Sequence, residues 1–335
     1  MFVQVNGFRR YFDVEGVGLF PGSGALREKP NTAAFVAQLA RAMRETCMLT
    51  KREFVLGATA IVASGAARAD AETLAAAFTR IEKESGGRLG VAVLDTQTGM
   101  QAGHRADERF PVCSTFKWLA AAAILRRVDA GVERLERRVH FGAKDLVTYS
   151  PVTEKHIADG MTLAELCDAA VTLSDNTAGN LLLAALGGPG GITTFARSLG
   201  DAVTRLDRIE PELNEATPGD PRDTTAPAAM TANLRALVIG DALSAASRAQ
   251  LTAWLVANKT GDTRLRARLP AGWRIGDKTG VGANGTNNDV GVIWPPGRAP
   301  VVVSAYLTGT AAMPPAQRDA AIAAVGHAVA EAIGG

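Results

Sequence analysis

Strand patterns lie near both ends of the chain and helical patterns lie between them, and this order most constrains the fold. Apolar residues run together or alternate over residues 88–94, 100–105, 273–279, 289–294 and 301–307. They recur at helical spacing over residues 71–84, 163–173, 177–186, 192–199, 230–240, 244–256 and 316–333. The order predicts an α/β (α+β) fold, in which terminal helices flank a five-stranded antiparallel sheet and an all-helical lobe is inserted.

The first 69 residues are expected to lie outside this fold. Residues 1–47 mix Gly, Pro and Arg without sustained periodicity, and we interpret them as an upstream extension. Residues 48–69 resemble an export signal, with Lys51 and Arg52 before an apolar run and Ala67-Arg68-Ala69 as a cleavage site. The basic pair also resembles a variant twin-arginine signal. Because the apolar run is too short to span a membrane, we expect an exported chain that begins near Asp70.

We therefore predict one folded domain over residues 70–335. Its sheet lobe would comprise residues from about 70 to 110 and from 257 to 335, and its helical lobe residues from about 111 to 256.

Composition excludes several partner classes. The chain has 335 residues and a formal net charge of +2, without a block of Lys and Arg, which gives no electrostatic reason to expect nucleic acid. The four histidines lack the spacing of a zinc site, so we expect no metal and no cofactor. Cys47 falls in the segment expected to be lost, and Cys113 and Cys167 alone are too few for a disulfide framework.

A candidate nucleophile lies where an extended segment turns into an apolar helix. Ser114 and Lys117 are three positions apart, so their side chains share one helix face. An amine in an apolar setting can take the hydroxyl proton, and the helix amino terminus favours a developing oxyanion. A capping serine beside a surface lysine is the competing interpretation, because the Ser-x-x-Lys pattern alone is common.

Further motifs follow Ser114 in chain order. They are Ser174-Asp175-Asn176 between two helices, the R-I-E-P-E-L-N stretch from Arg208 to Asn214, Asp223 at the end of the same loop, and Lys278-Thr279-Gly280 closing a predicted strand. In this order and spacing the set resembles the class A serine β-lactamases from about residue 71 onward.

The resemblance implies hydrolysis of the β-lactam amide of penicillins and cephalosporins through a serine acyl-enzyme, conferring antibiotic resistance. It implies Ser114 as nucleophile, with Lys117 and Glu210 as the two candidate acylation bases. Glu210 with Asn214 would activate the hydrolytic water, and Arg208 and Asp223 would pair to close that loop. The remaining implied roles are a proton relay at Ser174, substrate amide binding at Asn176, carboxylate binding at Lys278 and Thr279, and an oxyanion hole from the N–H groups of Ser114 and Val281. The Glu210–Pro211 peptide is expected to be cis.

Several positions depart from the family pattern. Asn287 stands where many relatives carry an arginine, and Arg264 resembles the substitute that some subgroups supply, with a solvated surface arginine as the alternative. Tyr149 is expected to line the cleft, with ordinary packing as its rival. Gly282 and Ala121 occupy the places of cysteine partners, so Cys113 and Cys167 are expected to be free thiols.

Two other function classes share part of this pattern. A D-alanyl-D-alanine peptidase of the penicillin-binding type has the Ser-x-x-Lys and Lys-Thr-Gly elements but lacks the water site. A non-hydrolysing β-lactam sensor would normally carry a membrane span. We expect a periplasmic monomer that acts on a small-molecule β-lactam, without stable membrane association after export.

Overall fold

The computed structural model describes residues 2–5, 8–11 and 70–334. Near the amino terminus β1 (Phe2–Val5) pairs antiparallel with β2 (Phe8–Tyr11), a pairing that the sequence analysis did not expect. The predicted export signal at 48–69 lies outside the described residues. The remaining described residues, 70–334, form a separate unit and are considered by themselves below.

The centre of this unit is a five-stranded antiparallel sheet in the order β4-β3-β11-β10-β9. The strands are β3 (Arg88–Asp95), β4 (Gln101–His104), β9 (Arg274–Gly282), β10 (Thr286–Trp294) and β11 (Val301–Thr308). Both ends of the chain contribute to the sheet, as predicted. The hairpin of β9 and β10 is longer than predicted: β9 continues past Thr279 to Gly282 and β10 begins at Thr286 instead of Asp289, because residues 279–282 pair with residues 286–289.

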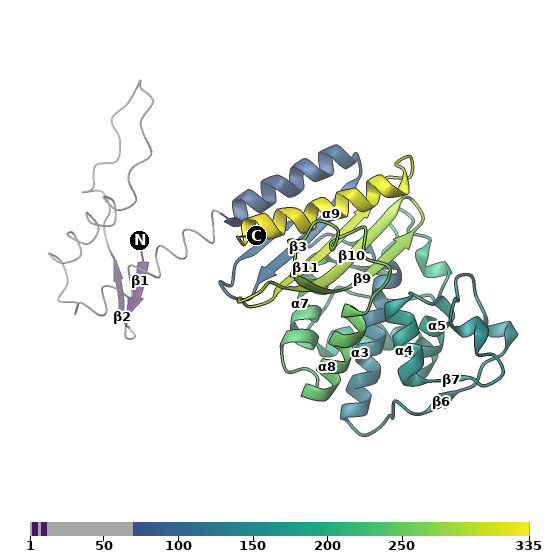
Figure 1. Ribbon diagram of the computed structural model, residues 1–335. Helices are drawn as coiled ribbons and strands as arrows, with labels where there is room; N and C mark the ends of the chain where they lie inside the picture. Colours follow the sequence, from purple (N-terminus) through teal and green to yellow (C-terminus); the bar gives the residue numbers. More distant parts are fainter. Residues whose placement is uncertain (1, 6–7, 12–69, 335) are drawn as a thin grey trace, which may run out of the picture. The chain divides into compact units, whose positions relative to one another are not determined.

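Two terminal helices cover one face of the sheet. Residues 70–85 form the first and α9 (Pro315–Ala332) forms the second, and Figure 1 shows them lying over the same side of the strands. Phe78 from the first helix and Val325 and Val329 from the second are fully buried with the odd-numbered residues of β11. Burial of apolar area supplies the main stabilisation of this face.

The helical lobe packs against the opposite face (Figure 1). Its helices are α3 (Phe116–Asp129), α4 (Leu163–Thr172), α5 (Asn176–Ala185), α6 (Gly190–Ser198), α7 (Pro227–Leu234) and α8 (Ala245–Val256). The predicted helix at 230–240 begins earlier, at Pro227, since proline suits a first helical turn, and it ends in a π-helical turn at Arg235–Ile239. All ten residues from Phe116 to Leu125 are buried, which makes α3 the axis of the lobe.

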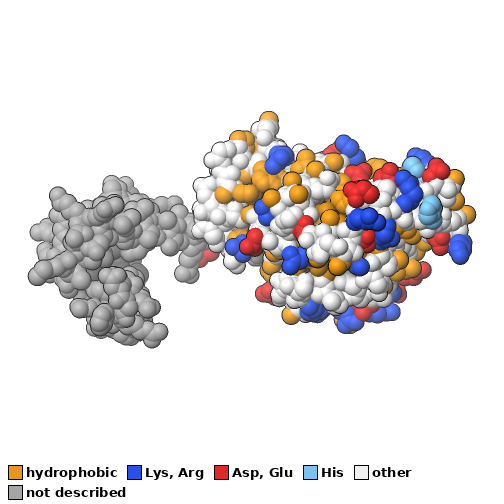
Figure 2. Space-filling view, turned by 90° about the horizontal axis from the view of Figure 1, so that it is seen from below, with side chains coloured by type: hydrophobic (Ala, Val, Ile, Leu, Met, Phe, Trp, Pro, Cys, Tyr) orange, Lys and Arg blue, Asp and Glu red, His pale blue; other side chains and the backbone are white. Residues whose placement is uncertain are grey.

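Short elements connect these parts. Two-residue strands form the pairs β5 (Phe110–Pro111) with β8 (Thr224–Thr225) and β6 (Arg138–Val139) with β7 (Met161–Thr162). Short 3-10 turns are η1 (Cys113–Thr115), η2 (Ala143–Asp145), η3 (Thr153–Lys155) and η4 (Glu212–Asn214). Acidic and basic side chains are interspersed over the face shown in Figure 2. Within residues 2–5, 8–11 and 70–334, no helix has the length and apolarity that crossing a membrane requires.

Candidate active site

Ser114 lies in η1, the tight turn between β5 and α3, and Lys117 lies in the first turn of α3. Cys113, the residue before Ser114, has a φ of 45°, which is an uncommon conformation for a residue with a side chain. Such backbone strain persists only where the surroundings enforce it, and it gathers at functional sites. Here the turn leaves the Ser114 hydroxyl facing Lys117 and the loop that carries Glu210.

The side chains of Ser114, Lys117 and Glu210 meet directly. The Ser114 hydroxyl donates to Oε1 of Glu210 at 3.0 Å and accepts from the Lys117 ammonium at 2.9 Å. Lys117 and Glu210 form an ion pair at 2.9 Å in which both side chains are fully buried. A buried ion pair is tolerated only when further hydrogen bonds satisfy both groups. The hydroxyl therefore contacts both groups that could take its proton, which are the Glu210 carboxylate and, once it is neutral, the Lys117 amine.

Lys117 is held by the lobe around it. Its ammonium also donates to the carbonyl of Ser174 at 2.8 Å and to Oδ1 of Asn176 at 2.6 Å. Burial lowers the pKa of Lys117 below its usual 10.5, and the nearby carboxylate of Glu210 opposes that change. Gly179 on α5 lies so close that an added Cβ would stand 2.9 Å from Cε of Lys117. Glycine at this position lets α5 approach the amine.

Ser174 lies in the connection between α4 and α5 and has a φ of 59°. Asp175 caps α5 by accepting from the N–H of Ala178 at 2.8 Å. Asn176 donates from its side-chain amide to the carbonyl of Thr148 at 2.8 Å. The Ser174 hydroxyl accepts from the Lys278 ammonium at 3.0 Å, so this short connection joins the helical lobe to the sheet.

Lys278 lies in β9 opposite Val290 of β10 and is fully buried. Its pKa lies well below the usual 10.5, chiefly because of burial and next because of repulsion from Lys117. The neighbouring Thr279 hydroxyl lies 2.5 Å from that of Thr260. The two ammonium groups and the Ser174 hydroxyl thus create a positive region beside Ser114.

β9 passes close to the turn that holds Ser114. A Cβ on Gly280 would stand 3.2 Å from side-chain atoms of both Cys113 and Thr115. Only glycine therefore allows this separation without displacement. The next residue, Val281, is more than half exposed (54%), so the strand presents its backbone and a small apolar side chain to solvent beside η1.

Glu210 lies in a loop without long helices or strands, and side chains hold it in place. Arg208 pairs with Asp223 at 2.6 Å, and Asp223 also accepts from the backbone N–H of Arg208 at 2.9 Å. Asn180 on α5 accepts from the Glu210 N–H at 2.8 Å and donates to its carbonyl at 2.9 Å. The Glu210–Pro211 peptide is cis, as expected.

Asn214 completes the surroundings of the Glu210 carboxylate. Its side-chain N–H donates to Oε2 of Glu210, and its backbone carbonyl accepts from Ala283 at 2.8 Å. Its side-chain oxygen is buried and accepts no hydrogen bond from the described residues. A buried acceptor without a donor is costly, so the geometry suits a small donor held between Asn214 and Glu210.

Arg264 is buried, so the alternative of a solvated surface arginine was wrong. Its guanidinium donates to Oδ1 of Asp319 on α9 at 2.8 Å and to the carbonyl of Asn288 at 2.8 Å. Asn287, which occupies the place of the arginine in many relatives, donates to the same Asp319 oxygen at 2.9 Å. Arg264 also donates to the carbonyl of Gly280, at 3.3 Å, and this places it against β9 at the last residue of the Lys-Thr-Gly motif.

The other predicted residues lie as follows. Tyr149 has a φ of 65° and is 56% exposed, so it is not packed in the core, and its carbonyl accepts from the N–H of Asn176 at 2.9 Å. Cys113 and Cys167 are both buried free thiols, as predicted. A Cβ on Gly282 would stand 2.7 Å from the sulfur of Cys113, which shows how closely β9 approaches that thiol.

Sequence reasoning missed two residues that support the site. Asn180 follows Asn176 by four positions and therefore lies on the same face of α5, a signal that was available. Asp319, on the terminal helix, gave no local signal because its partners Arg264 and Asn287 lie more than thirty positions away. Among the described residues, no group of three His, Cys, Asp or Glu side chains is placed to hold a metal ion.

A sheet with an inserted helical lobe, and a serine between a buried lysine and a buried glutamate, define a serine hydrolase of the β-lactamase type. A family model described as "Beta-lactamase enzyme family" matches residues 73–333. Beta-lactamase AST-1 of Nocardia asteroides is 58% identical over 231 residues, which are 69% of this chain and 74% of the relative. Beta-lactamase CTX-M-8 of Citrobacter amalonaticus is 52% identical over 244 residues, which are 73% and 84% of the two chains.

Solved structures agree with this assignment. An ancestral (GNCA) class A β-lactamase is 68% identical with a TM-score of 0.76, and the match covers 77% of this chain and 99% of that one. A putative class A β-lactamase from Rhodopseudomonas palustris is 64% identical with the same TM-score and coverage. The chain belongs to the class A β-lactamases.

Proposed function

We propose that Ser114 opens the β-lactam ring and that Glu210 then releases the acyl group with water. The observation that carries this is the direct contact of the Ser114 hydroxyl with both Lys117 and Glu210. In acylation the serine oxygen bonds to the ring carbonyl carbon and the ring C–N bond breaks. The hydroxyl proton leaves to Glu210, or to Lys117 after that ammonium has given a proton to Glu210, and Ser174 relays a proton to the departing nitrogen. The backbone N–H groups of Ser114 and Val281 would stabilise the oxyanion.

Deacylation needs a positioned water, and the residues around Glu210 suit one. The Glu210 carboxylate would take a proton from water while the unpartnered Asn214 oxygen accepts its second O–H. The resulting hydroxide bonds to the acyl carbon, the bond to the serine oxygen breaks, and that oxygen takes back the proton held by Glu210. A penicillin-binding peptidase lacks this pair, so the pair favours hydrolysis with turnover over peptidase or sensor activity.

Substrate binding would use the positive side of the site. The fixed charge of Lys278 and the Thr279 hydroxyl would bind the carboxylate that penicillins and cephalosporins share. Arg264 would add charge from behind β9, Asn176 would bind the substrate's side-chain amide, and Tyr149 would form an exposed aromatic wall.

Glu210→Ala tests the reaction sequence. We expect steady-state turnover of a chromogenic cephalosporin to fall roughly 1,000-fold, because the variant lacks the general base for water. Mass spectrometry of the intact protein should then show a stable acyl adduct on Ser114. Wild-type turnover that persists in excess chelator would exclude a metal-dependent reaction. If the variant forms no adduct, Glu210 is the base that takes the serine proton in acylation. If the variant forms the adduct rapidly, Lys117 is that base.

We also propose that the chain is exported to the periplasm, by a twin-arginine-type signal, and acts there as a monomer without stable membrane association. The sequence signals at 48–69 support export, and all the proposed catalytic groups come from one chain. Expression in a Gram-negative host should yield periplasmic protein beginning near Asp70 by intact-mass analysis. Lys51→Gln with Arg52→Gln should keep the protein in the cytoplasm, and unchanged export would contradict the signal assignment.

A further inference from the structure

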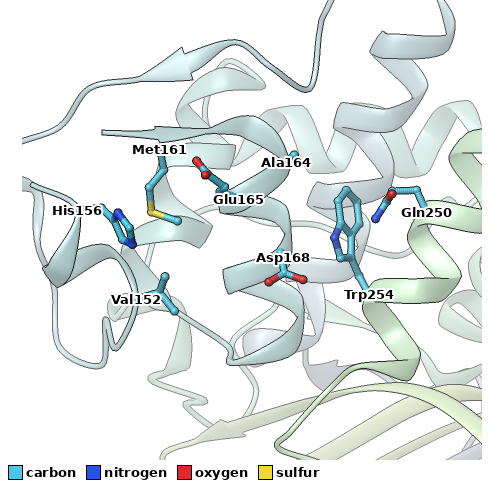
Figure 3. A pocket seen from close by; sticks show the side chains of 8 residues that line it. All are labelled: Val152, His156, Met161, Ala164, Glu165, Asp168, Gln250 and Trp254. Carbon is cyan, nitrogen blue, oxygen red and sulfur yellow. The ribbon is translucent and has the colours of Figure 1, made fainter. Parts of the chain in front are cut away.

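A pocket of about 370 Å³ lies between α4, α8 and the loop that precedes β7, and it shares no lining residue with the active site (Figure 3). Met161, Ala164 and Val152 give it an apolar wall. Asp168, Gln250 and Trp254 place polar groups around the same space. A concave site with an apolar wall and a few convergent polar groups is the usual form of a small-molecule site.

Trp254 presents a donor to this pocket. The residue is only 5% exposed, yet its indole N–H donates to none of the described residues. Figure 3 shows the nitrogen-bearing edge of the indole on the side of Asp168. The nitrogen itself reaches the surface of the pocket, so its N–H can donate to water or to an acceptor that a ligand supplies.

Asp168 presents an unpaired carboxylate. No described side chain donates to it, and partial burial raises its pKa. Glu165 adds a second carboxylate, which accepts from the N–H of Thr162 at 2.7 Å. His156 is the one basic side chain among the residues that line the pocket. Two carboxylates give the pocket a preference for cations over anions.

We propose that this pocket binds a small organic ammonium ion that carries a hydroxyl or carbonyl oxygen two carbon atoms from its cationic nitrogen. The ammonium donates to Asp168, the oxygen accepts from the Trp254 N–H, and the apolar part of the ligand packs on Met161 and Ala164. The Asp168 carboxylate and the Trp254 N–H, which have no side-chain partner among the described residues, thereby each gain one. A bare metal ion would leave the indole N–H unpaired and the apolar wall unused.

The probe for this site is 2-amino-1-phenylethanol, which combines the three features. The protein has four tryptophans, so a ¹H–¹⁵N spectrum shows four indole N–H signals. Titration should shift the Trp254 signal saturably and leave the other three unchanged, with a dissociation constant of about 1 mM. The neutral 1-phenylethane-1,2-diol and the anion mandelate serve as matched ligands and should not saturate. No saturable shift with the ammonium, or an equal response to the diol, would overturn the proposal.

Asp168→Asn should weaken binding about 10-fold or more, because a charge-assisted hydrogen bond is lost while size is kept. Asp107→Asn removes one exposed charge elsewhere and should leave the affinity unchanged. Trp254→Phe identifies the indole signal, and unaltered β-lactam turnover shows that the variant is folded. Equal affinity of the Asp168→Asn and Asp107→Asn variants for the ammonium ligand would also overturn the proposal. This result does not depend on whether the protein hydrolyses β-lactams.

Discussion

Glu210 and Lys278 are both buried charged groups beside Ser114, but the chain holds them in different ways. Lys278 lies within β9, where backbone pairing with β10 from residue 274 to residue 282 fixes its place. Glu210 lies in an irregular loop, and side chains of Asn180, Arg208 and Asp223 fix it. No single substitution removes a strand ladder, whereas one substitution removes a side-chain contact. The loop is therefore the part of the site that point changes can loosen.

The difference also separates the two chemical steps. The strand side carries positive charge for the substrate carboxylate, and the loop side carries the carboxylate proposed to activate water. Changes at Lys278 should therefore act on substrate capture, and changes around Glu210 should act on release of the acyl group. Three measurements test whether this division holds.

Lys278→Met should give the largest effect of the three. We expect kcat/KM for penicillins to fall roughly 100-fold, because a charged hydrogen bond to the substrate carboxylate is lost. The fold should persist, since β9 keeps its backbone pairing and Met has a similar volume. Steady-state kinetics with a thermal melt measure both properties. Unfolding of the variant would show that backbone pairing alone does not hold β9. An unchanged kcat/KM would show that Lys278 does not bind the substrate carboxylate.

Asp223→Asn should give a smaller and more selective effect. It keeps the size and the acceptor for the Arg208 N–H but removes the charge that pairs with the Arg208 guanidinium. We expect deacylation to fall about 10-fold and acylation to fall less, because the loop loosens around Glu210. Burst kinetics separate the two steps, and Asp262→Asn, at an exposed ion pair of 3.9 Å, is the control. An equal fall in the acylation and deacylation rates would refute the proposal that this loop acts mainly on deacylation.

The pH dependence of stability should show the smallest effect. The pKa of Lys278 is lower in the folded state than its usual 10.5, so over the interval between the two values the unfolded chain binds more protons. The free energy of unfolding should therefore rise with pH over that interval, by at most about 1.4 kcal/mol per pH unit for one proton. Urea unfolding of the wild type and of Lys278→Met should show the steeper rise in the wild type. Parallel curves would show that the Lys278 pKa is not lowered.

Much of this protein follows from its sequence. The periods of apolar residues located the strands and helices, because core-facing positions must repeat at 2 or 3.6 residues. The order of Ser114, Ser174, Glu210 and Lys278 indicated the family and the residues to examine. Element ends were less certain, as at β9, where pairing with β10 rather than local preference decides how far the strand runs.

Tertiary structure decided what joins residues far apart in the chain. The Ser114–Glu210 contact spans 96 positions, and the path of the loop between them cannot be deduced from periodicity. Periodicity also does not predict the hydrogen bond between Asn180 and Glu210 or the ion pair between Asp319 and Arg264. Local preferences act over a few residues, so they specify helices, turns and caps. A polar side chain on a loop or helix finds its distant partner only when the packed core brings the two together.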